Sequence, residues 1–342
     1  MSVVTPQDFR PLDRTDAGMT YGVLLPHFGA DASPKRIIEG AVLAEDIGLD
    51  AVWVRDHLLW TPHGMEGTDP TFVEPLTVLA AIASRTSKIY MGSAVLIPLR
   101  WPLKLAQDLA SLSYLAGGRV IAGLGLGSGE KELGAVGFKR SDRKKIFVET
   151  AEIVRKVWYQ DRMDHNGQMF QYEDIGIFPK PVDPIPIWYG GTTTISVKNA
   201  VEYCDAWMPG RIPLATLDDR LATLDELVAA KGNKITKSII PLVKVEKDRE
   251  RARANVPIEA LAGSSEASAT WIQPEGGFKE LDDLRGIITV GNPDEVIEQI
   301  AEIASRGIDH FVFDLRMQHD RFEETLELIA NDVLPTLKKD RI

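Results

Sequence analysis

Residues 102–129, PLKLAQDLASLSYLAGGRVIAGLGLGSG, contain a helix, a strand and a glycine-rich loop in one run. A helix is expected over 102–115, with Leu105, Leu109 and Leu112 on one face, and an apolar strand over 120–124. Alternate glycines after the strand let another group approach the backbone closely. The spacing is G-x-G-x-G-x-G, not the G-x-G-x-x-G of dinucleotide folds, so the loop alone does not identify a ligand.

The order of strand and helix repeats along the chain. Eight apolar strands are expected, over 21–26, 51–54, 89–97, 120–124, 185–189, 206–208, 239–245 and 310–315, with helices between them. Apolar strands joined by helical crossovers form a parallel sheet, and eight of them favour a closed (β/α)8 TIM barrel over an open sheet. The predicted organisation is an N-terminal tail over 1–19 and one domain over 20–342, with insertions near 161–184 and 262–286.

Composition narrows the functional class. The chain has 342 residues, 44% of them hydrophobic and 26% charged, with a formal net charge of -11. Such a charge argues against nonspecific nucleic-acid binding, which requires a basic surface. The single Cys204 excludes an internal disulfide, and no apolar run approaches the length of a membrane span. Residues 1–20 lack a signal-peptide core, so a cytoplasmic protein is expected.

Ligands of such a barrel bind at the carboxyl ends of the strands. His27 follows the first strand, and Asp56, His57 and Trp60 follow the second. A histidine at this position could move a proton near neutral pH, or could only satisfy backbone groups. The histidines show no metal-ligand spacing, so no metal is expected.

Two further groups have alternative interpretations. Gly191 and three threonines from Thr192 precede a helix expected near Ile195, so they could cradle a phosphate, or Thr194 could simply cap the helix. Glu130 and Glu132, after the glycine loop, could be acid–base residues or could compensate a helix dipole.

Taken together, these motifs resemble the bacterial luciferase-like family, and the resemblance runs from Tyr21 to about Leu337. The matching segments, in order, are 22–26, 44–57, 89–95, 117–119 with the glycine loop, Glu132 with Ala135 and Gly137, Arg143 with Glu149, 186–191, 204–207 and 307–311.

The resemblance implies a barrel that binds FMN or the deazaflavin coenzyme F420, with the ring in the barrel mouth against the third strand. In the F420 branch a nonprolyl cis peptide commonly bulges that strand, and the matching place is Ser93-Ala94-Val95. In the same branch Asp56 would meet the cofactor, and His57 would lie near the ring and the substrate. The predicted cofactor-binding residues are Asp56, Ser93, Ala94, Val95, Gly125, Gly127, Ser128, Gly190, Gly191 and Thr192.

Two positions depart from the sugar phosphate and secondary alcohol dehydrogenases of this branch. Ser128 stands where those enzymes have an acidic residue, and Thr61, beside Trp60, stands where they have an aromatic one. The predicted catalytic residues are therefore His57 and Glu130, and His27 and Trp60 are predicted to line the substrate pocket.

The leading hypothesis is an F420-dependent oxidoreductase that transfers a hydride between the deazaflavin C5 and a small organic substrate. The alternative is an FMN-dependent monooxygenase acting with oxygen and reduced flavin. A third hypothesis is a cofactor-free barrel that serves as a binding or subunit partner. The resemblance also implies a homodimer formed through helices near 75–84 and 103–115, and neither a membrane nor a nucleic acid is expected as a partner.

Overall fold

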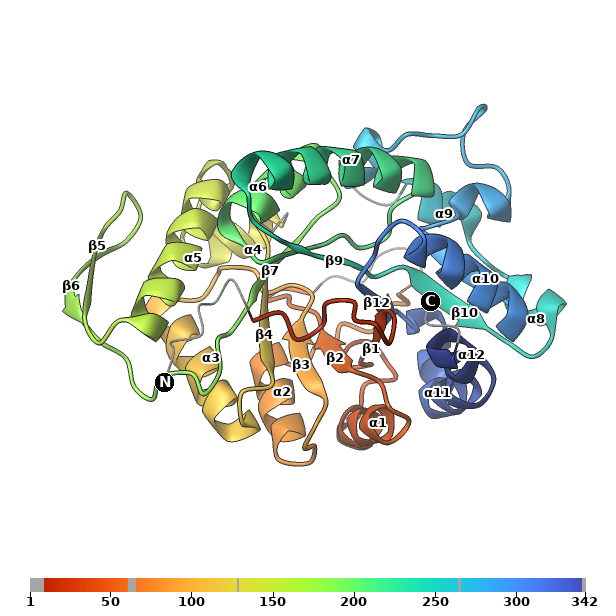
Figure 1. Cartoon of the computed structure of the whole chain (residues 1–342), viewed down its shortest axis with the longest axis horizontal. Coiled ribbons are helices and arrows are strands. Elements are labelled where there is room, and N and C mark those ends of the chain that lie inside the picture. The colour runs from red at the N-terminus through yellow and green to blue at the C-terminus, as the bar shows by residue number, and fades with distance from the viewer. Residues whose placement is uncertain (1–8, 61–65, 128, 264–265, 340–342) are drawn as a thin grey trace.

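The computed structural model describes residues 9–60, 66–127, 129–263 and 266–339 (Figure 1). Eight parallel strands close a barrel in the order β1-β12-β9-β8-β7-β4-β3-β2. Their bounds are β1 Thr20–Leu24, β2 Ala51–Val54, β3 Tyr90–Ser93, β4 Val120–Leu124, β7 Ile187–Gly190, β8 Ala206–Met208, β9 Thr236–Ile239 and β12 His310–Phe313. The predicted TIM barrel is confirmed.

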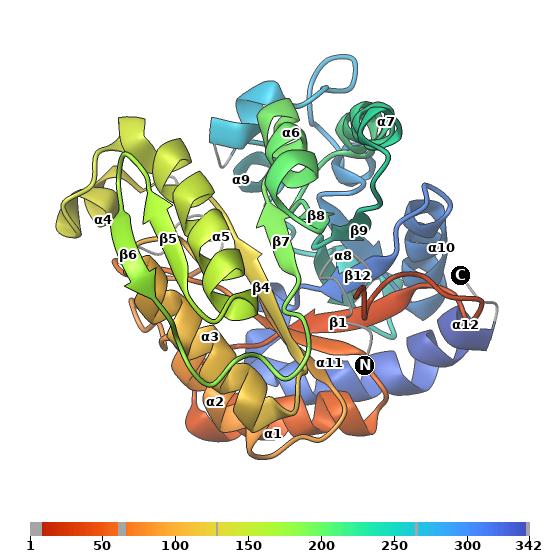
Figure 2. The same ribbon diagram turned by 60° about the vertical axis from the view of Figure 1, so that its left-hand side comes forward.

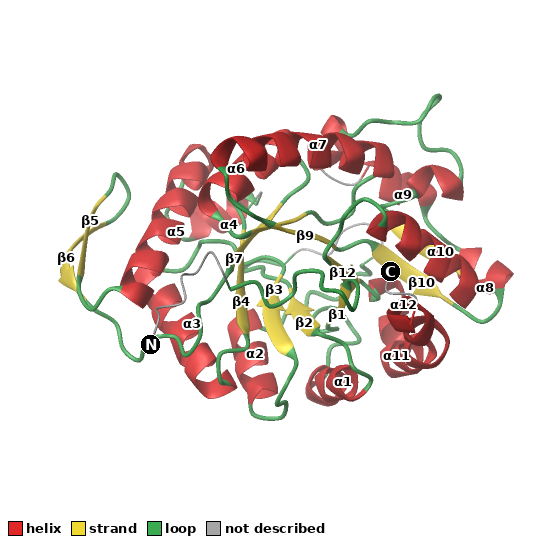
Figure 3. Ribbon diagram, viewed as in Figure 1, coloured by secondary structure: helices red, strands yellow, loops and turns green. Residues whose placement is uncertain are grey.

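Helices surround the strands on all sides (Figure 3). The helices around the barrel are α1 Pro34–Asp46, α2 Pro75–Ala83, α3 Pro102–Ala116, α4 Glu130–Ala135, α5 Arg143–Tyr159, α6 Thr194–Tyr203, α7 Leu214–Lys231, α10 Pro293–Ala304, α11 Phe322–Leu328 and α12 Leu334–Lys339. Shorter segments are α8 Arg249–Arg253, α9 Ile258–Gly263, the 3-10 turns Arg140–Asp142, Glu266–Thr270, Leu281–Leu284 and Arg316–Arg321, and the π-helical turn Ile329–Val333. Across the described residues, none of the helices combines the length and apolarity that crossing a bilayer requires.

The seventh barrel strand differs from the prediction over 239–245. The barrel strand β9 ends at Ile239, and Leu242–Val245 forms β10, which pairs with β11, Ile288–Gly291, outside the barrel. Pro241 separates the two strands, because proline has no N–H to continue a ladder. The strand β11 was not predicted.

The predicted insertion near 161–184 forms an antiparallel hairpin of β5, Met163–Asn166, and β6, Gln171–Ile175. The hairpin lies along α5 at the side of the barrel (Figure 2). Glu149 of α5 holds it there, because its carboxylate accepts hydrogen bonds from the backbone N–H groups of Gln168, Met169 and Phe170.

Residues 9–19, the described part of the predicted N-terminal tail, contact the barrel at several points. Leu12 is buried in the apolar cluster inside the barrel, and its carbonyl accepts a hydrogen bond from Thr20 Oγ1 at 2.8 Å. The Arg14 guanidinium donates to the Ala304 carbonyl at the end of α10. This segment therefore lies against the amino-terminal side of the barrel, where β1 begins.

The barrel interior is filled by aromatic side chains. Trp53 and Trp188 lie 5.0 Å apart between ring centroids, and Trp53 Nε1 donates a hydrogen bond to His310 Nε2 at 3.1 Å. Because these side chains are buried and occupy the barrel axis, space for a ligand exists only beyond them, at the carboxyl ends of the strands.

Candidate active site at the barrel mouth

A cavity of about 220 Å³ opens at the carboxyl ends of the barrel strands. It is lined by Leu24, Arg55, Ala94, Thr192, Gly210, Arg211, Ile240, Trp271, Asp314 and Arg316. These residues come from the ends of β1, β2, β3, β7, β8, β9 and β12 and from the insertion that contains Trp271. The cavity lies where the barrel fold is expected to bind its ligand.

One wall of the mouth is an extension of β3. The peptide bond between Ala94 and Val95 is cis, and neither residue is proline, so the expected nonprolyl cis peptide is confirmed at this place. The Ala94 N–H donates to the Val54 carbonyl at 2.6 Å, and the Leu96 N–H donates to the Gly123 carbonyl at 2.8 Å. Ala94 faces the cavity, whereas Val95 packs behind it.

The glycine loop is the support of this wall. A Cβ on Gly125 would lie 2.5 Å from Val95 Cγ2, and one on Gly127 would lie 2.6 Å from Ile97 Cγ2. A Cβ on Gly190 would come within 2.7 Å of the same Val95 side chain. These glycines are therefore required by a close approach of the chain to itself. The predicted cofactor contact of Ser128 lies outside the described residues.

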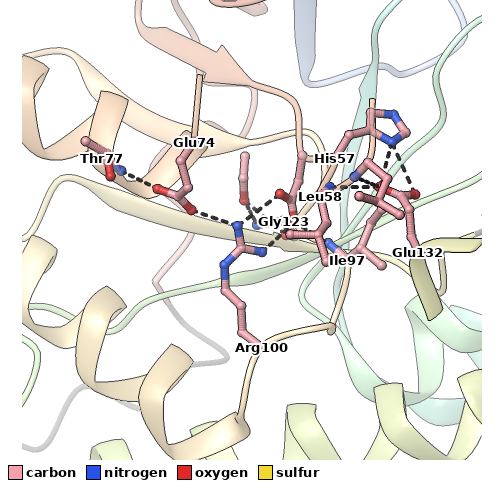
Figure 4. Close-up of polar contacts among 11 residues, drawn as sticks. His57, Leu58, Glu74, Thr77, Ile97, Arg100, Gly123 and Glu132 are labelled. Atoms are coloured by element: carbon pink, nitrogen blue, oxygen red, sulfur yellow. Dashed lines mark hydrogen bonds and ion pairs between the residues drawn. The ribbon is translucent and has the colours of Figure 1, made fainter. Parts of the chain in front are cut away.

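Ser93 and Asp56 hold the same wall through hydrogen bonds to the backbone around it. The buried Ser93 hydroxyl donates to the Gly123 carbonyl at 3.0 Å. The buried Asp56 carboxylate accepts the Ile97 N–H at 2.8 Å and two hydrogen bonds from Arg100, at 2.6 and 3.0 Å. Arg100 also reaches Glu74 (Figure 4). Both Asp56 oxygens thus bind within the protein, so Asp56 positions the wall.

His57 is paired with Glu132, not with Glu130. His57 Nδ1 lies 3.3 Å from Glu132 Oε1, and that oxygen also accepts the backbone N–H groups of Leu58 and Leu59 at 2.7 and 3.0 Å (Figure 4). Burial raises the pKa of Glu132, but the hydrogen bonds from His57 and the two amides outweigh it and hold the pKa below its ordinary value. Glu132 is therefore a buried carboxylate that fixes one nitrogen of the imidazole.

Glu130 lies in the first turn of α4 and is exposed. It is two residues away from Glu132, and a two-residue step on a helix turns a side chain by about 200°, to the opposite face. The structure therefore brings Glu132 to His57 and leaves Glu130 at the surface.

His27 and Trp60 belong to an aromatic cluster beside the cavity. The fully buried His27 accepts the Arg55 N–H at Nε2, at 2.8 Å, and donates from Nδ1 to the Val73 carbonyl, at 3.0 Å. Burial lowers the pKa of His27 to about 4, so the ring is neutral at neutral pH. Trp60 packs on His57 with centroids 4.9 Å apart, and its other neighbours are Phe28 and Phe72.

Gly190, Gly191 and Thr192 join β7 to α6. The helix begins at Thr194, and its cap is Thr193, whose Oγ1 accepts the Ser196 N–H at 3.1 Å. The alternative of capping by Thr194 is therefore wrong by one residue. Thr192 lines the cavity, and within the described chain its buried Oγ1 has no hydrogen-bond partner. A buried hydroxyl without a partner is a group that a ligand can satisfy.

The charged side chains around the cavity were not predicted as site residues from the sequence. Arg55 and Arg316 both donate to Glu66, at 2.9 and 2.5 Å, and Arg316 also binds Asp314. Burial raises the pKa of Asp314, but Arg316 and Arg55 outweigh it and lower the pKa. Arg211 lies beside them in the lining of the cavity. Asp314 and Arg316 follow β12 directly, so examining the ends of the last strands as closely as the first would have found them.

Comparison with known proteins places this barrel in a family. The sequence profile described as luciferase-like monooxygenase matches residues 12–310. The chain belongs to the luciferase-like monooxygenase family. The family resemblance predicted from the sequence is thereby confirmed, and it covers most of the described barrel.

The similarity to members of this family and to structures of the same fold covers nearly the whole chain. The chain is 29% identical to a protein named F420-dependent glucose-6-phosphate dehydrogenase from Amycolatopsis mediterranei. The similarity covers 89% of this chain and 95% of that protein. Monooxygenase RslO1 from Streptomyces bottropensis has a TM-score of 0.75 at 24% identity, covering 93% of this chain and 99% of that one. The coenzyme F420 dependent tetrahydromethanopterin reductase from Methanopyrus kandleri has a TM-score of 0.72 at 19% identity, with 93% and 99% covered.

Proposed function

We propose that this protein is an F420-dependent oxidoreductase that transfers a hydride between the deazaflavin C5 and a small organic substrate. The observation that carries the proposal is the pairing of His57 with the buried Glu132 beside the barrel mouth. The curated relatives named F420-dependent glucose-6-phosphate dehydrogenase, at 29% and 28% identity over about nine tenths of this chain, support the same cofactor.

The residues at the mouth fit a flat, anionic cofactor. The wall at Ala94 and Val95 offers an apolar surface, and the glycine loop and Gly190 fix its position. The unpartnered Thr192 hydroxyl stands before the amino-terminal end of α6, where backbone N–H groups favour an anion. These residues would hold the cofactor, with Asp56 acting through the wall. When bound, F420 supplies the hydride chemistry.

His57 would handle the proton that accompanies hydride transfer. Because its Nδ1 faces Glu132, the N–H at Nδ1 donates to the carboxylate and the lone pair at Nε2 is left for the substrate. A substrate hydroxyl would give its proton to Nε2 as the hydride leaves the carbon, and the reverse reaction would return it. Glu132 keeps the imidazole in this orientation and stabilises the imidazolium that forms.

Glu132 also supplies an acidic side chain near His57, although Ser128 stands at the position where an acidic residue was expected. The dehydrogenases of the F420 branch were expected to have an acidic residue there, and this chain has a serine. The acidic side chain next to His57 comes instead from Glu132, four residues further on, in the first turn of α4. We therefore propose that Glu132 positions His57, whereas Glu130 was predicted from the sequence as a catalytic residue.

A reconstitution experiment tests the proposal against the FMN alternative. The protein is titrated separately with F420 and with reduced FMN, and oxygen consumption is recorded. It is then incubated with F420 and a panel of small alcohols and hydroxy acids while the deazaflavin absorbance is followed. We expect saturable F420 binding, deazaflavin reduction by part of the panel, and no oxygen consumption with FMN. Tight binding of reduced FMN with oxygen turnover, and no response to F420, would establish the monooxygenase instead.

We also propose that the enzyme is a homodimer formed through α2 and α3. At the end of α3, Tyr114 and Leu115 are exposed, and the exposed Val182 adjoins them through the hydrogen bond from its N–H to Ser113 Oγ. Exposed apolar side chains that gather on one face are typical of an interface between subunits.

A cytoplasmic location is a further part of the proposal. It is supported by Cys204, which is a buried free thiol. Burial raises the pKa of this thiol above its ordinary value, so Cys204 resists oxidation only while it stays buried in the folded protein. Fractionation of the native host, with immunodetection of the protein in each fraction, tests the location.

A further inference from the structure

We propose that Arg211 binds a monoanionic group, a carboxylate, of the substrate. The inference rests on the proposed function, because it names the substrate class of the same cavity. It starts from the charged residues that line or adjoin this cavity.

Three arginines meet at this wall, but only two of them are neutralised. Arg55 pairs with Glu66 at 2.9 Å, and Arg316 pairs with both Glu66 and Asp314. The third, Arg211, lies in the cavity lining and, among the residues that the structure describes, has neither a hydrogen bond nor an ion pair. Three guanidinium groups and two carboxylates leave one uncompensated positive charge beside the cavity.

The environment of Arg211 shows that this charge is poorly solvated. Burial lowers the pKa of Arg211, and the neighbouring Arg316 lowers it further, whereas Asp314 and Glu66 act in the opposite direction. A partly buried cation with a second cation beside it gains stability when an anion binds next to it.

A second donor belongs to another residue that lines the same cavity. Trp271 is 8% exposed, lines the cavity, and its indole Nε1 has no hydrogen-bond partner in the described part of the chain. Its backbone neighbour Ile272 is fixed to α7 by a hydrogen bond to Thr216 Oγ1, at 2.8 Å. α7 follows β8 and Arg211, so the indole and the guanidinium belong to the same side of the mouth. Together they can donate to one carboxylate.

The position of Arg211 separates it from the cis peptide bond between Ala94 and Val95. Arg211 follows β8, and β7 and β4 stand between β8 and β3 in the barrel order. Arg211 therefore lies across the mouth from Ala94 and Val95. Thr192, which follows the neighbouring β7, lines the same cavity, so the Kd for F420 in the Arg211 variants decides whether the bound group belongs to the substrate or to the cofactor.

The balance of charges at the cavity indicates a monoanion. The single excess positive charge balances one carboxylate, whereas the dianion of a phosphate monoester would leave one negative charge unbalanced in a partly buried site. The inferred substrate class is therefore a small hydroxy acid or oxo acid, which differs from the sugar phosphate in the names of the curated relatives.

The experiment compares matched probes on matched variants. Butanoate, butanamide and inorganic phosphate are titrated into wild type, Arg211→Gln, Arg211→Lys and the control Arg249→Gln, followed by tryptophan fluorescence. Arg249 pairs with Glu295 outside the barrel mouth. The Kd for F420 is measured for each protein, and thermal unfolding establishes that the variants fold.

We expect wild type and Arg249→Gln to bind butanoate at least tenfold more tightly than butanamide, and Arg211→Gln to lose this preference, with its Kd for F420 unchanged within about twofold. A charge-assisted hydrogen bond is worth about tenfold in affinity or more. Arg211→Lys should retain part of the preference. If wild type fails to bind F420 but still shows the preference, the carboxylate site stands and the proposed function fails.

Three results would overturn the inference. Equal affinity of wild type and Arg211→Gln for butanoate would show that Arg211 holds no carboxylate. A loss of F420 affinity in Arg211→Gln as large as the loss for butanoate would assign the arginine to the cofactor's own anionic groups. Tighter binding of phosphate than of butanoate by wild type would exclude the monoanion class.

Discussion

At the residue scale, the pairing of His57 with Glu132 is the feature on which the proposed chemistry depends. Replacing Glu132 by Gln removes the carboxylate that fixes the imidazole and stabilises its protonated form. We expect kcat for F420-linked turnover to fall by about 10²-fold, within the range measured for general acid–base groups, while the Kd for F420 changes little. Steady-state kinetics and fluorescence titration measure the two quantities.

Glu130→Gln is the matched control for this change. It makes the same chemical substitution two residues away, on an exposed side chain. The structure predicts turnover close to wild type for Glu130→Gln. A large loss in Glu130→Gln with none in Glu132→Gln would restore the sequence-based assignment and contradict the geometry.

His27 makes stability depend on pH. Its pKa of about 4 in the folded protein is below the roughly 6.5 of an unfolded chain, so the unfolded state binds the extra proton between these values. The contribution of His27 to the free energy of unfolding should therefore be fully present above about pH 6.5. It should be lost as the pH falls toward 4, which lowers the free energy of unfolding by about 3 kcal/mol. Urea unfolding of wild type and His27→Gln across this range measures the difference. Equal slopes for the two proteins would show that His27 does not contribute.

Single residues differ in how far the sequence predicts them. The Asp56-His57 pair could be predicted because it directly follows an apolar strand. The resemblance to the luciferase-like family also places this pair at the end of the second strand. The choice of Glu132 over Glu130 could not, because it depends on which face of α4 turns toward β2. That Arg211 has no hydrogen bond or ion pair among the described residues was also beyond prediction, since Glu66 and Asp314 lie more than 100 residues away from it on either side.

At the element scale, the glycine loop supports the β3 extension. Gly125→Ala would push Val95 and move the cofactor wall, because the new Cβ would lie 2.5 Å from Val95 Cγ2. We expect a loss of about 1–3 kcal/mol in unfolding free energy, as for an overpacked core, and weaker F420 binding. Chemical denaturation and F420 titration measure both effects.

Gly134→Ala is the control for the glycine loop. It lies in α4, and its new Cβ would meet nothing within 4 Å among the described atoms, so stability should stay the same or rise by about 0.5–1 kcal/mol. Adding Val95→Ala to Gly125→Ala should recover part of the lost stability. Failure of that second change to recover any stability would show that the loop does not act through Val95.

The elements show where pattern analysis succeeds and fails. Eight apolar strands between helical segments were enough to predict a barrel, because burial on both faces leaves few other solutions. The seventh strand was misplaced because 239–245 is apolar on both sides of Pro241, and apolarity alone does not reveal that the chain leaves the barrel there. The β5-β6 hairpin was not predicted, because its strands are short and partly exposed.

At the scale of the whole molecule, the proposed dimer can be separated from the fold. Leu115 is 67% exposed on α3, and Ile195 is 61% exposed on α6. Light scattering after size-exclusion chromatography should give a dimer for wild type and for Ile195→Lys, and a monomer at low concentration for Leu115→Lys, because a buried lysine without a partner opposes association. A monomeric wild type, or a Leu115→Lys dimer as stable as wild type, would place the interface elsewhere or exclude it.

The two walls of the barrel mouth have different roles in the proposed hydride transfer. Supporting residues such as Ser93, Asp56 and the glycines fix one wall of the mouth, whereas the opposite wall carries the charged residues after β8 and β12. We infer that the first wall sets the cofactor and the second sets the substrate. This division agrees with the resemblance, which covers the first wall well and gave no indication of Arg211.

The central claim is that this barrel mouth binds coenzyme F420. Mass spectrometry of the small molecules released from protein purified from its native host tests it most directly. We predict a deazaflavin with the mass of F420, present in wild type and depleted in Gly125→Ala. FMN in its place, at a comparable ratio to protein, would contradict the claim.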